Sequence, residues 1–271
     1  MSPRAITSIA AAAAFLLFTL FEIAWPLRRS VESKVRRIVR NLTLGGISFA
    51  ILSLVQAPLL TPLAMWSERN EIGLLYRLGI PRPWLTVAMI VLLDYTLWFW
   101  HWLNHKVPLL WRFHLVHHVD RDLDASTALR FHLGELLLSV AFRAAHIVVL
   151  GADVTALWLW QTILFVSILF HHSNIRLPAA VDRALVRLIV TPRMHGIHHS
   201  DRREETDSNW SSILSVWDFL HRTMRVDVPQ ESVTIGVPAY DDPRDVTIGK
   251  ALLLPFRKQT DDWSRRTLHQ P

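Results

Sequence analysis

The sequence predicts an all-α fold, a polytopic bundle of about four to five membrane spans with a helical cap that carries clustered histidines. Of the 271 residues 51% are apolar, and the mean hydropathy is positive, which is unusual for a soluble protein of this length. Five apolar stretches approach the roughly 20 residues that cross a bilayer as a helix. Tryptophan outnumbers tyrosine by 12 to 3, and tryptophan concentrates at membrane interfaces.

Each apolar stretch is expected to form one span, and the stretches occupy residues 6–25, 42–66, 84–103, 133–150 and 154–170. The first resembles a signal peptide, but it lacks a clear polar region and cleavage site before Pro26, so we expect a retained span. Pro58 and Pro62 are expected to break the second span. Only residues 151–153 separate the last two stretches, which predicts a tight antiparallel hairpin. The alternative is that these two stretches are re-entrant, or that one of them is a core helix.

Basic residues indicate the side of the membrane that each connection occupies, because cytoplasmic loops are enriched in Lys and Arg. Six lie between residues 28 and 40, four lie between 104 and 132, and 14 follow Phe170. A topology with residues 28–40, 104–132 and 171–271 in the cytoplasm satisfies this rule throughout. We therefore interpret the net charge of +6 as a topology signal and expect no nucleic-acid partner. The absence of cysteine excludes disulfides, thiolate metal sites and cysteine nucleophiles.

Three regions follow from these patterns. Residues 1–83 form an N-terminal transmembrane region, residues 84–225 form a histidine-rich region, and residues 226–271 form a cytoplasmic tail. Residues 173–225 are expected to fold as a helical cytoplasmic cap. Within the tail, residues 248–256 are expected to lie on the membrane surface.

Ten of the 14 histidines fall in four short clusters, each at or beyond the predicted cytoplasmic face. The clusters are His101 with His105, His114 with His117 and His118, His171 with His172, and His195 with His198 and His199. Histidines at positions i and i+4 share one helix face, so a cluster can present several imidazoles to one point. A single cluster could be a polar helix face, but four clusters on one side of the membrane predict a metal site.

The number of imidazoles predicts two metal ions. Eight or nine ligands exceed the four that one zinc ion takes, whereas two ions would receive four or five each. Imidazole suits Zn, Cu, Fe and Ni, so the donor type alone does not choose the metal. A histidine-rich dinuclear iron centre at a membrane surface fits the ligand count, the placement and the apolar body together.

The order HxxxH, HxxHH, His-Ser-Asn and HxxHH resembles the fatty acid hydroxylase/sterol desaturase superfamily over residues 84–223. Further segments are similar to motifs of that family, namely Arg130-Phe131-His132 with Glu135, Arg193-Met194, Asn209 and Trp217-Asp218. The resemblance implies nine metal ligands, which are His101, His105, His114, His117, His118, His172, His195, His198 and His199. It also implies O2-dependent hydroxylation or desaturation by a non-haem centre of two iron ions. Electrons would come from a separate donor protein of ferredoxin or cytochrome type.

The sequence departs from the family pattern at two places. Leu133 and Gly134 follow His132 where the family usually has a Pro-containing turn. His221 stands where family members often carry glycine.

Six further polar residues are candidates for catalytic or supporting roles beside the metals: Asp94, His132, His171, Asn174, Asp207 and Asn209. Asp94 lies two helical turns below His101 on the same face, so it could orient a ligand imidazole or make a buried interhelical hydrogen bond. His171 and His172 are alternative ligands, and the residue next to Ser-Asn is favoured.

The expected function is oxidation of a C–H bond of a lipid or sterol-like substrate by O2, since no side chain can activate O2 alone. A histidine-rich metal transporter is one alternative, but it needs polar residues through the spans, where only Asp94, Arg143 and His146 are available. A haem electron-transfer protein is a second, but it would place single histidines deep in the bilayer. A membrane zinc hydrolase is a third. The identity of the substrate, and hydroxylation versus desaturation, are left open.

Overall fold

The computed structural model describes residues 3–260 and 263, and these residues form helices with three isolated β-bridges and no named strand. The long helices are α1 (Pro3–Ala24), α2 (Lys34–Arg69), α3 (Arg82–Lys106), α5 (Leu133–His146) and α6 (Val154–His172). A π-helix, η3 (Ile147–Gly151), continues α5. Five helices in the described residues are long and apolar enough to cross a membrane, which confirms the predicted all-α membrane bundle.

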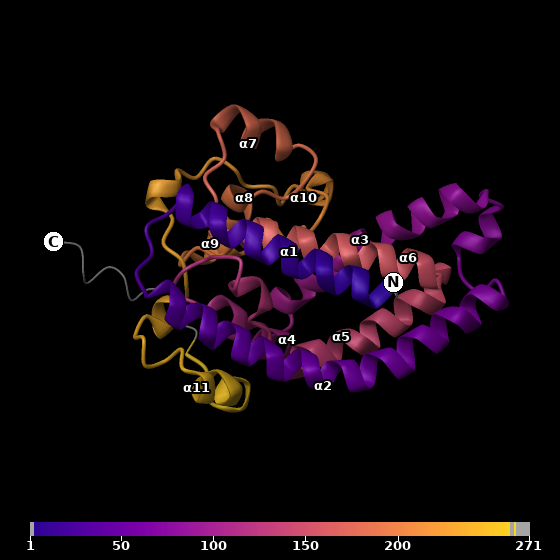
Figure 1. Ribbon diagram of the computed structural model, residues 1–271, viewed down its shortest axis with the longest axis horizontal. Helices are drawn as coiled ribbons and strands as arrows, with labels where there is room; N and C mark the ends of the chain where they lie inside the picture. Colours follow the sequence, from indigo (N-terminus) through magenta and orange to yellow (C-terminus); the bar gives the residue numbers. More distant parts are fainter. Residues whose placement is uncertain (1–2, 261–262, 264–271) are drawn as a thin grey trace.

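The long helices run along the long axis of the molecule, and most of the short elements gather toward one end (Figure 1). These short elements are α4 (Pro108–His118), η2 (Thr127–Leu129), α7 (Ala179–Leu185), α8 (Pro192–His198), α9 (Arg203–Thr206), α10 (Val216–His221), η4 (Gln230–Ser232), η5 (Pro238–Tyr240), α11 (Ile248–Leu253) and η6 (Leu254–Phe256). The remaining element, η1 (Leu75–Leu78), connects α2 to α3 at the opposite end. These short elements, apart from η1, therefore form a cap on one end of the bundle.

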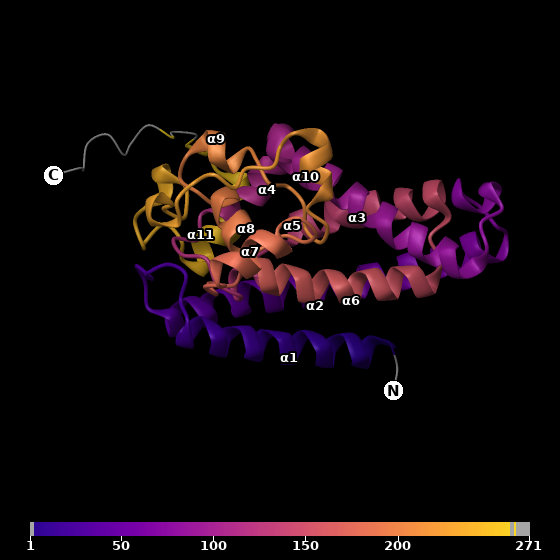
Figure 2. The same cartoon turned by 90° about the horizontal axis from the view of Figure 1, so that it is seen from above.

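Helix α1 lies along α6 on one side of the bundle, as Figure 2 shows from above. Its outward face is apolar, with Leu16 and Leu20 63% and 66% exposed. Leu54 on α2 is exposed to a similar degree. Contiguous apolar surface of this kind is rare on a soluble monomer and is the surface that lipid covers.

The expected break in the second span is wrong, because α2 continues through Pro58 and Pro62 to Arg69. The two prolines are four residues apart, so the N–H that Pro62 lacks is the one that would have bonded to the carbonyl of Pro58. The defects therefore fall in adjoining turns. In a bilayer, ending the helix there would leave several more backbone N–H and C=O groups without hydrogen-bond partners, since no water is present. A continuous helix therefore has the lower free energy.

The chain reverses direction around Gly151 between the last two spans, but α5 packs mainly on α2 and α6 packs on α1 and α3, so the two spans do not form the tight hairpin that was predicted. Gly151 has φ +86° and lies so close to the turn after α2 that a Cβ would meet the carbonyl oxygen of Ile72 at 2.8 Å. Gly73 is equally restricted, because its Cβ would fall 2.2 Å from the Gly151 nitrogen. Asp153 then caps α6 by accepting the N–H of Ala156 at 2.6 Å. Gly73 and Gly151 therefore allow the turn after α2 to touch the turn between α5 and α6.

The main apolar core lies between α2, α3, α5 and α6, where Leu52, Leu93, Val140 and Trp160 are buried in one cluster. A separate cluster ties the segment after residue 226 to the cap, because Val228 and Ile235 pack on Leu123 and Ile197. This packing holds the C-terminal segment against the loop after α4 and against α8.

Candidate metal centre

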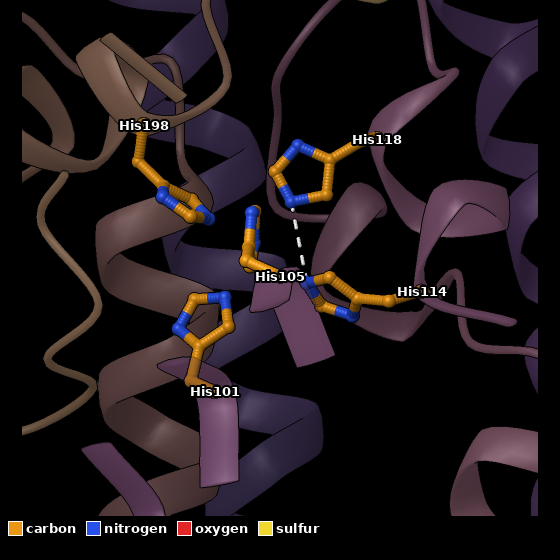
Figure 3. A group of neighbouring side chains, drawn as sticks. All are labelled: His101, His105, His114, His118 and His198. Carbon is orange, nitrogen blue, oxygen red and sulfur yellow. Dashed lines mark hydrogen bonds between the residues drawn. The ribbon is translucent and has the colours of Figure 1, made fainter. Parts of the chain in front are cut away.

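Nine histidines meet where the bundle joins the cap, and their side chains form two groups. Within each group, one nitrogen of every ring lies within 4.8 Å of the corresponding nitrogens of the others. The first histidine group is His101, His105, His114, His118 and His198, and the second histidine group is His117, His172, His195 and His199. Figure 3 shows the five rings of the first group turned toward one another. Each group has enough donors for one ion.

Each of the two HxxHH clusters is divided between the two groups. His114 and His118 are one turn apart on α4 and enter the first group, whereas His117 faces the second. The pattern is reversed on α8, where His195 and His199 enter the second group and His198 enters the first. Each cluster therefore supplies a pair of imidazoles to one group and a single imidazole to the other.

The ends of two long helices complete the groups. His101 and His105 lie in the last two turns of α3, and His172 is the last residue of α6. Pro108 starts α4 directly after α3, which reverses the chain and brings the first two clusters together. The site is therefore built on rigid helix ends and not on the loops between them.

Backbone carbonyls fix the orientation of four of these rings. Carbonyl oxygens only accept, so a ring nitrogen that contacts one carries the proton. The Nδ1 atoms donate to carbonyls in four rings: His101 to Trp210 at 2.8 Å, His117 to Arg130 at 3.3 Å, His172 to Ile168 at 2.8 Å and His198 to Ser208 at 2.7 Å. In a neutral imidazole the Nε2 atom then has only a lone pair to offer.

These lone pairs face one another inside the protein, which is the arrangement that a cation would stabilise. The Nε2 atoms of His117 and His172 are 3.0 Å apart, although each is the unprotonated nitrogen. The Nε2 atom of His198 is buried without a hydrogen-bond partner among the described residues. Neutral imidazole nitrogens are metal ligands, and a partner for each Nδ1–H is the usual support of such a ligand. The donor set therefore fits two metal ions.

Two carboxylates lie next to the first histidine group. The Nδ1 atom of His114 is 2.9 Å from a carboxylate oxygen of Glu135, and both side chains are buried. Asp207 lies 3.9 Å from the Nδ1 atom of His105 and forms a 2.8 Å ion pair with Lys106. Glu135 is placed to orient His114, and Asp207 lies just beyond hydrogen-bond distance of His105.

The other predicted site residues lie outside the two groups. His171 is buried with its ring centroid 4.1 Å from that of His195, but it belongs to neither group. His132 caps α5, since its Nδ1 atom accepts the N–H of Gly134 at 2.9 Å while its Nε2 atom donates to the carbonyl of Leu252. Both of its ring nitrogens are therefore occupied.

Asp94, Asn174 and Asn209 hold backbone segments. Asp94 accepts hydrogen bonds from the backbone N–H of Leu214 and from the indole N–H of Trp217. None of its hydrogen bonds in the described residues goes to a histidine. Asn209 has φ +57° and donates to the carbonyl of Met194, next to His195. Asn174 exchanges two hydrogen bonds with the backbone of Arg28, and its own N–H donates to Glu22.

A buried network of charges supports the cluster of His114, His117 and His118, and it was missed in the sequence. Arg37 of α2 donates to both Asp120 and Asp124, and its side chain is 1% exposed. Asn41 accepts from Arg130, whose Nε–H donates to the carbonyl of Val116 beside His117. The alternation of Asp120, Asp122 and Asp124 directly after the cluster was the available signal.

The network also sets the charge of Asp120. Burial alone would raise the pKa of this carboxyl, but the Arg37 and Arg130 guanidinium groups lower it well below its usual range. Asp120 therefore remains ionised, and it anchors the end of α4 to α2 through Arg37, Arg40 and Asn41.

Acid is expected to destabilise the metal-free protein. Burial, followed by the charges of neighbouring histidines, holds the pKa values of His118, His195 and His199 well below 6.5, and burial lowers that of His198 to about 3. The unfolded chain binds protons at these histidines near pH 6.5 and the folded chain does not, so stability is lost progressively as the pH falls below 6.5. Thermal unfolding of chelator-treated protein in detergent between pH 8 and 5 measures this. A midpoint that stays constant or rises would contradict it.

Comparison with known proteins identifies relatives of the chain. The sequence profile described as fatty acid hydroxylase matches residues 86–223. The chain is 29% identical to the ornithine lipid hydroxylase OlsE of Rhizobium tropici over 158 residues, which cover 58% of this chain and 46% of that protein. It is 23% identical to the alkylglycerol monooxygenase of Homo sapiens over 226 residues, covering 82% of this chain and 48% of the relative.

A third relative is the cholesterol 25-hydroxylase of Mus musculus, 27% identical over 138 residues that cover 50% of this chain and 45% of the relative. The chain thus spans about half the length of the curated relatives that it matches. No solved structure matches it. The matched segment contains all nine histidines of the two groups and slightly more than half of the 271 residues, and the chain belongs to the fatty acid hydroxylase family.

Proposed function

We propose that the protein is a membrane-bound hydroxylase that uses two iron ions and O2 to oxidise a C–H bond of a lipid or sterol-like substrate. The observation that carries this proposal is the pair of buried histidine groups whose unprotonated nitrogens converge at the end of the spans. The relatives support the reaction class, since their names describe hydroxylases or monooxygenases that act on an ornithine lipid, an alkylglycerol or cholesterol.

In this proposal the first histidine group holds one ion and the second histidine group holds the other. When bound, two iron ions would supply the activation of O2 and the electron transfers that oxidation of an unactivated C–H bond requires. All the donors are imidazoles, which by themselves do not distinguish iron from zinc or copper. The choice of iron rests on the hydroxylase and monooxygenase relatives.

The chain itself would orient the ligands and exclude water. Carbonyls of Trp210, Arg130, Ile168 and Ser208 fix four rings with Nε2 inward. Most of the ligand side chains are buried, so few water molecules could compete for the metals or reach a reactive intermediate. Glu135 would hold His114 in place by accepting its Nδ1–H.

The substrate would approach from the bilayer, because α3 and α6 lead from the membrane directly to the two groups. We place the cap in the cytoplasm, in accord with the distribution of Lys and Arg. A separate ferredoxin-type or cytochrome-type protein would then deliver electrons from that side. The relatives favour hydroxylation over desaturation, since none of their names describes a desaturase.

Lipid profiling under 18O2 tests the proposal. Membranes with the wild-type chain are compared with membranes that carry the same chain with His117 and His198 both replaced by alanine. We expect a lipid heavier by one oxygen atom derived from O2, only in the wild type, and about two iron ions per purified chain without a Soret band. A product lighter by two hydrogens would indicate desaturation instead. Identical lipids in both membranes, or a haem spectrum, would exclude the proposed function.

A further inference from the structure

The short helices α11 and η6 lie beside the membrane-spanning helices at the cap end of the bundle. Ala251 of α11 is buried against Leu44 of α2 and Val116 of α4. The carbonyl of Leu252 accepts a hydrogen bond from His132, the residue that caps the span α5. Figure 1 shows α11 next to the first part of α2. The segment therefore lies at the level where α5 begins to cross the membrane.

The outward face of this segment is apolar. Leu253 is 47% exposed and Phe256 is 70% exposed. The Phe256 ring contacts His132 and Phe113 on its inner side, with centroid separations of 5.8 and 5.9 Å, and leaves its outer side uncovered by the described residues. A large apolar side chain held outward at the depth of a span end has lipid as its natural neighbour.

Cationic side chains follow the apolar pair directly. Arg257 and Lys258 are exposed and form no ion pair within residues 3–260. Lys250, on the helix itself, is exposed and pairs with Asp245 at 2.7 Å. Exposed apolar residues next to unpaired cations are the combination that binds the surface of an anionic bilayer.

Hydrogen bonds fix the segment to α4. Arg112 donates from Nε to the carbonyl of Pro255 at 2.8 Å and from a terminal nitrogen to that of Arg257 at 2.6 Å. Gln259 donates to the carbonyl of Arg112 at 2.8 Å. Arg112 lies two residues before His114, so the position of η6 is coupled to the helix that carries three histidines of the two groups.

We propose that α11 and η6 form a membrane-surface anchor, with Leu253 and Phe256 inserted at the headgroup–acyl boundary and with Arg257 and Lys258 on anionic lipid headgroups. The occupant is the bilayer that already surrounds α2 and α5, because Ala251 packs on Leu44 of α2 and Leu252 is hydrogen-bonded to His132, which caps α5. The anchor holds α4 at a fixed depth relative to the spans. It is independent of the metal and of the reaction.

Nitroxide labelling tests the anchor, and the absence of cysteine in the chain makes a single label unambiguous. Phe256→Cys and Leu253→Cys are labelled separately in the full chain, in vesicles of phosphatidylcholine with or without phosphatidylglycerol. The matched control is Asp227→Cys, whose side chain is 82% exposed on the part of the cap that packs on Ile197. Collision rates with O2 and with a water-soluble nickel complex report the depth of each label.

We expect the ratio of O2 to nickel collisions to be several-fold higher at residues 253 and 256 than at 227. Adding phosphatidylglycerol should raise it further, and replacing Arg257 and Lys258 by glutamine should remove that increase. A water-like ratio at both 253 and 256 would overturn the anchor and indicate a surface for a protein partner. A high ratio that does not respond to lipid charge or to the glutamine substitutions would overturn the headgroup contact.

Discussion

Replacing His198 by alanine is expected to abolish substrate oxidation and to lower bound iron by about half, because one donor of the first histidine group is lost while the second group keeps all of its donors. The activity loss should exceed the roughly 10–100-fold that removal of an outer hydrogen-bond partner of a metal ligand costs. Iron per chain by elemental analysis, together with turnover in proteoliposomes, measures both effects.

His117→Ala is the reciprocal experiment, since it removes a donor from the second histidine group only. His221→Ala is the matched control. That ring is exposed, stacks on Trp98 with a centroid separation of 3.9 Å and belongs to neither group. The control should retain iron and turnover. Full iron and full turnover in both His117→Ala and His198→Ala would mean that the two groups are not the metal site.

The sequence predicted which histidines meet because their spacing is a local property of a helix. His114 and His118 share a face whatever the rest of the fold does, and the apolar stretches place all four clusters at one end of the bundle. The resemblance to a family then separated His172, which enters the second group, from His171, which does not. Helix geometry and membrane topology together therefore predicted most of the histidines that meet in the candidate site.

The division of the histidines into two groups could not be predicted in this way. Whether His117 or His118 faces a given group depends on how α4 is rotated about its axis, and that rotation is set by its packing on α3, α5 and η6. The position of Asp94 shows the same limit. Its spacing from His101 suggested that it would orient a ligand imidazole. Instead, Leu214 and Trp217 donate hydrogen bonds to its carboxylate.

Residues outside the family match hold the loops that follow the histidine clusters. Glu22 of α1 accepts the N–H groups of Ala125 and Asn174, which lie in the loops after the second and third clusters. Arg37 of α2 also holds the loop after α4, because it donates hydrogen bonds to Asp120 and Asp124. The matched segment begins at residue 86, so the N-terminal helices are part of the support of the candidate metal centre as well as membrane spans.

Arg37→Ala should therefore destabilise the protein severely, by about 3–5 kcal/mol, because it leaves buried carboxylates without their cation. Asp120 and Asp124 would both lose a charged partner, while Asp120 would keep Arg40 and Asn41. Arg37→Lys keeps the charge but cannot make the forked contact to two carboxylates, so we expect its loss of stability to be smaller than that of Arg37→Ala. Thermal unfolding in detergent gives the order of the three proteins.

Arg36→Ala is the appropriate control, since Arg36 is the preceding residue of α2, is exposed and forms no ion pair in the described part of the chain. Its unfolding temperature should stay near that of the wild type, because an exposed charge contributes little. If Arg37→Ala were no less stable than Arg36→Ala, the carboxylates would have to be neutral or solvated. The loop after α4 would then be held by something other than this network. If Arg37→Ala loses iron as well as stability, α2 positions His117 and His118 through Asp120 and Arg130.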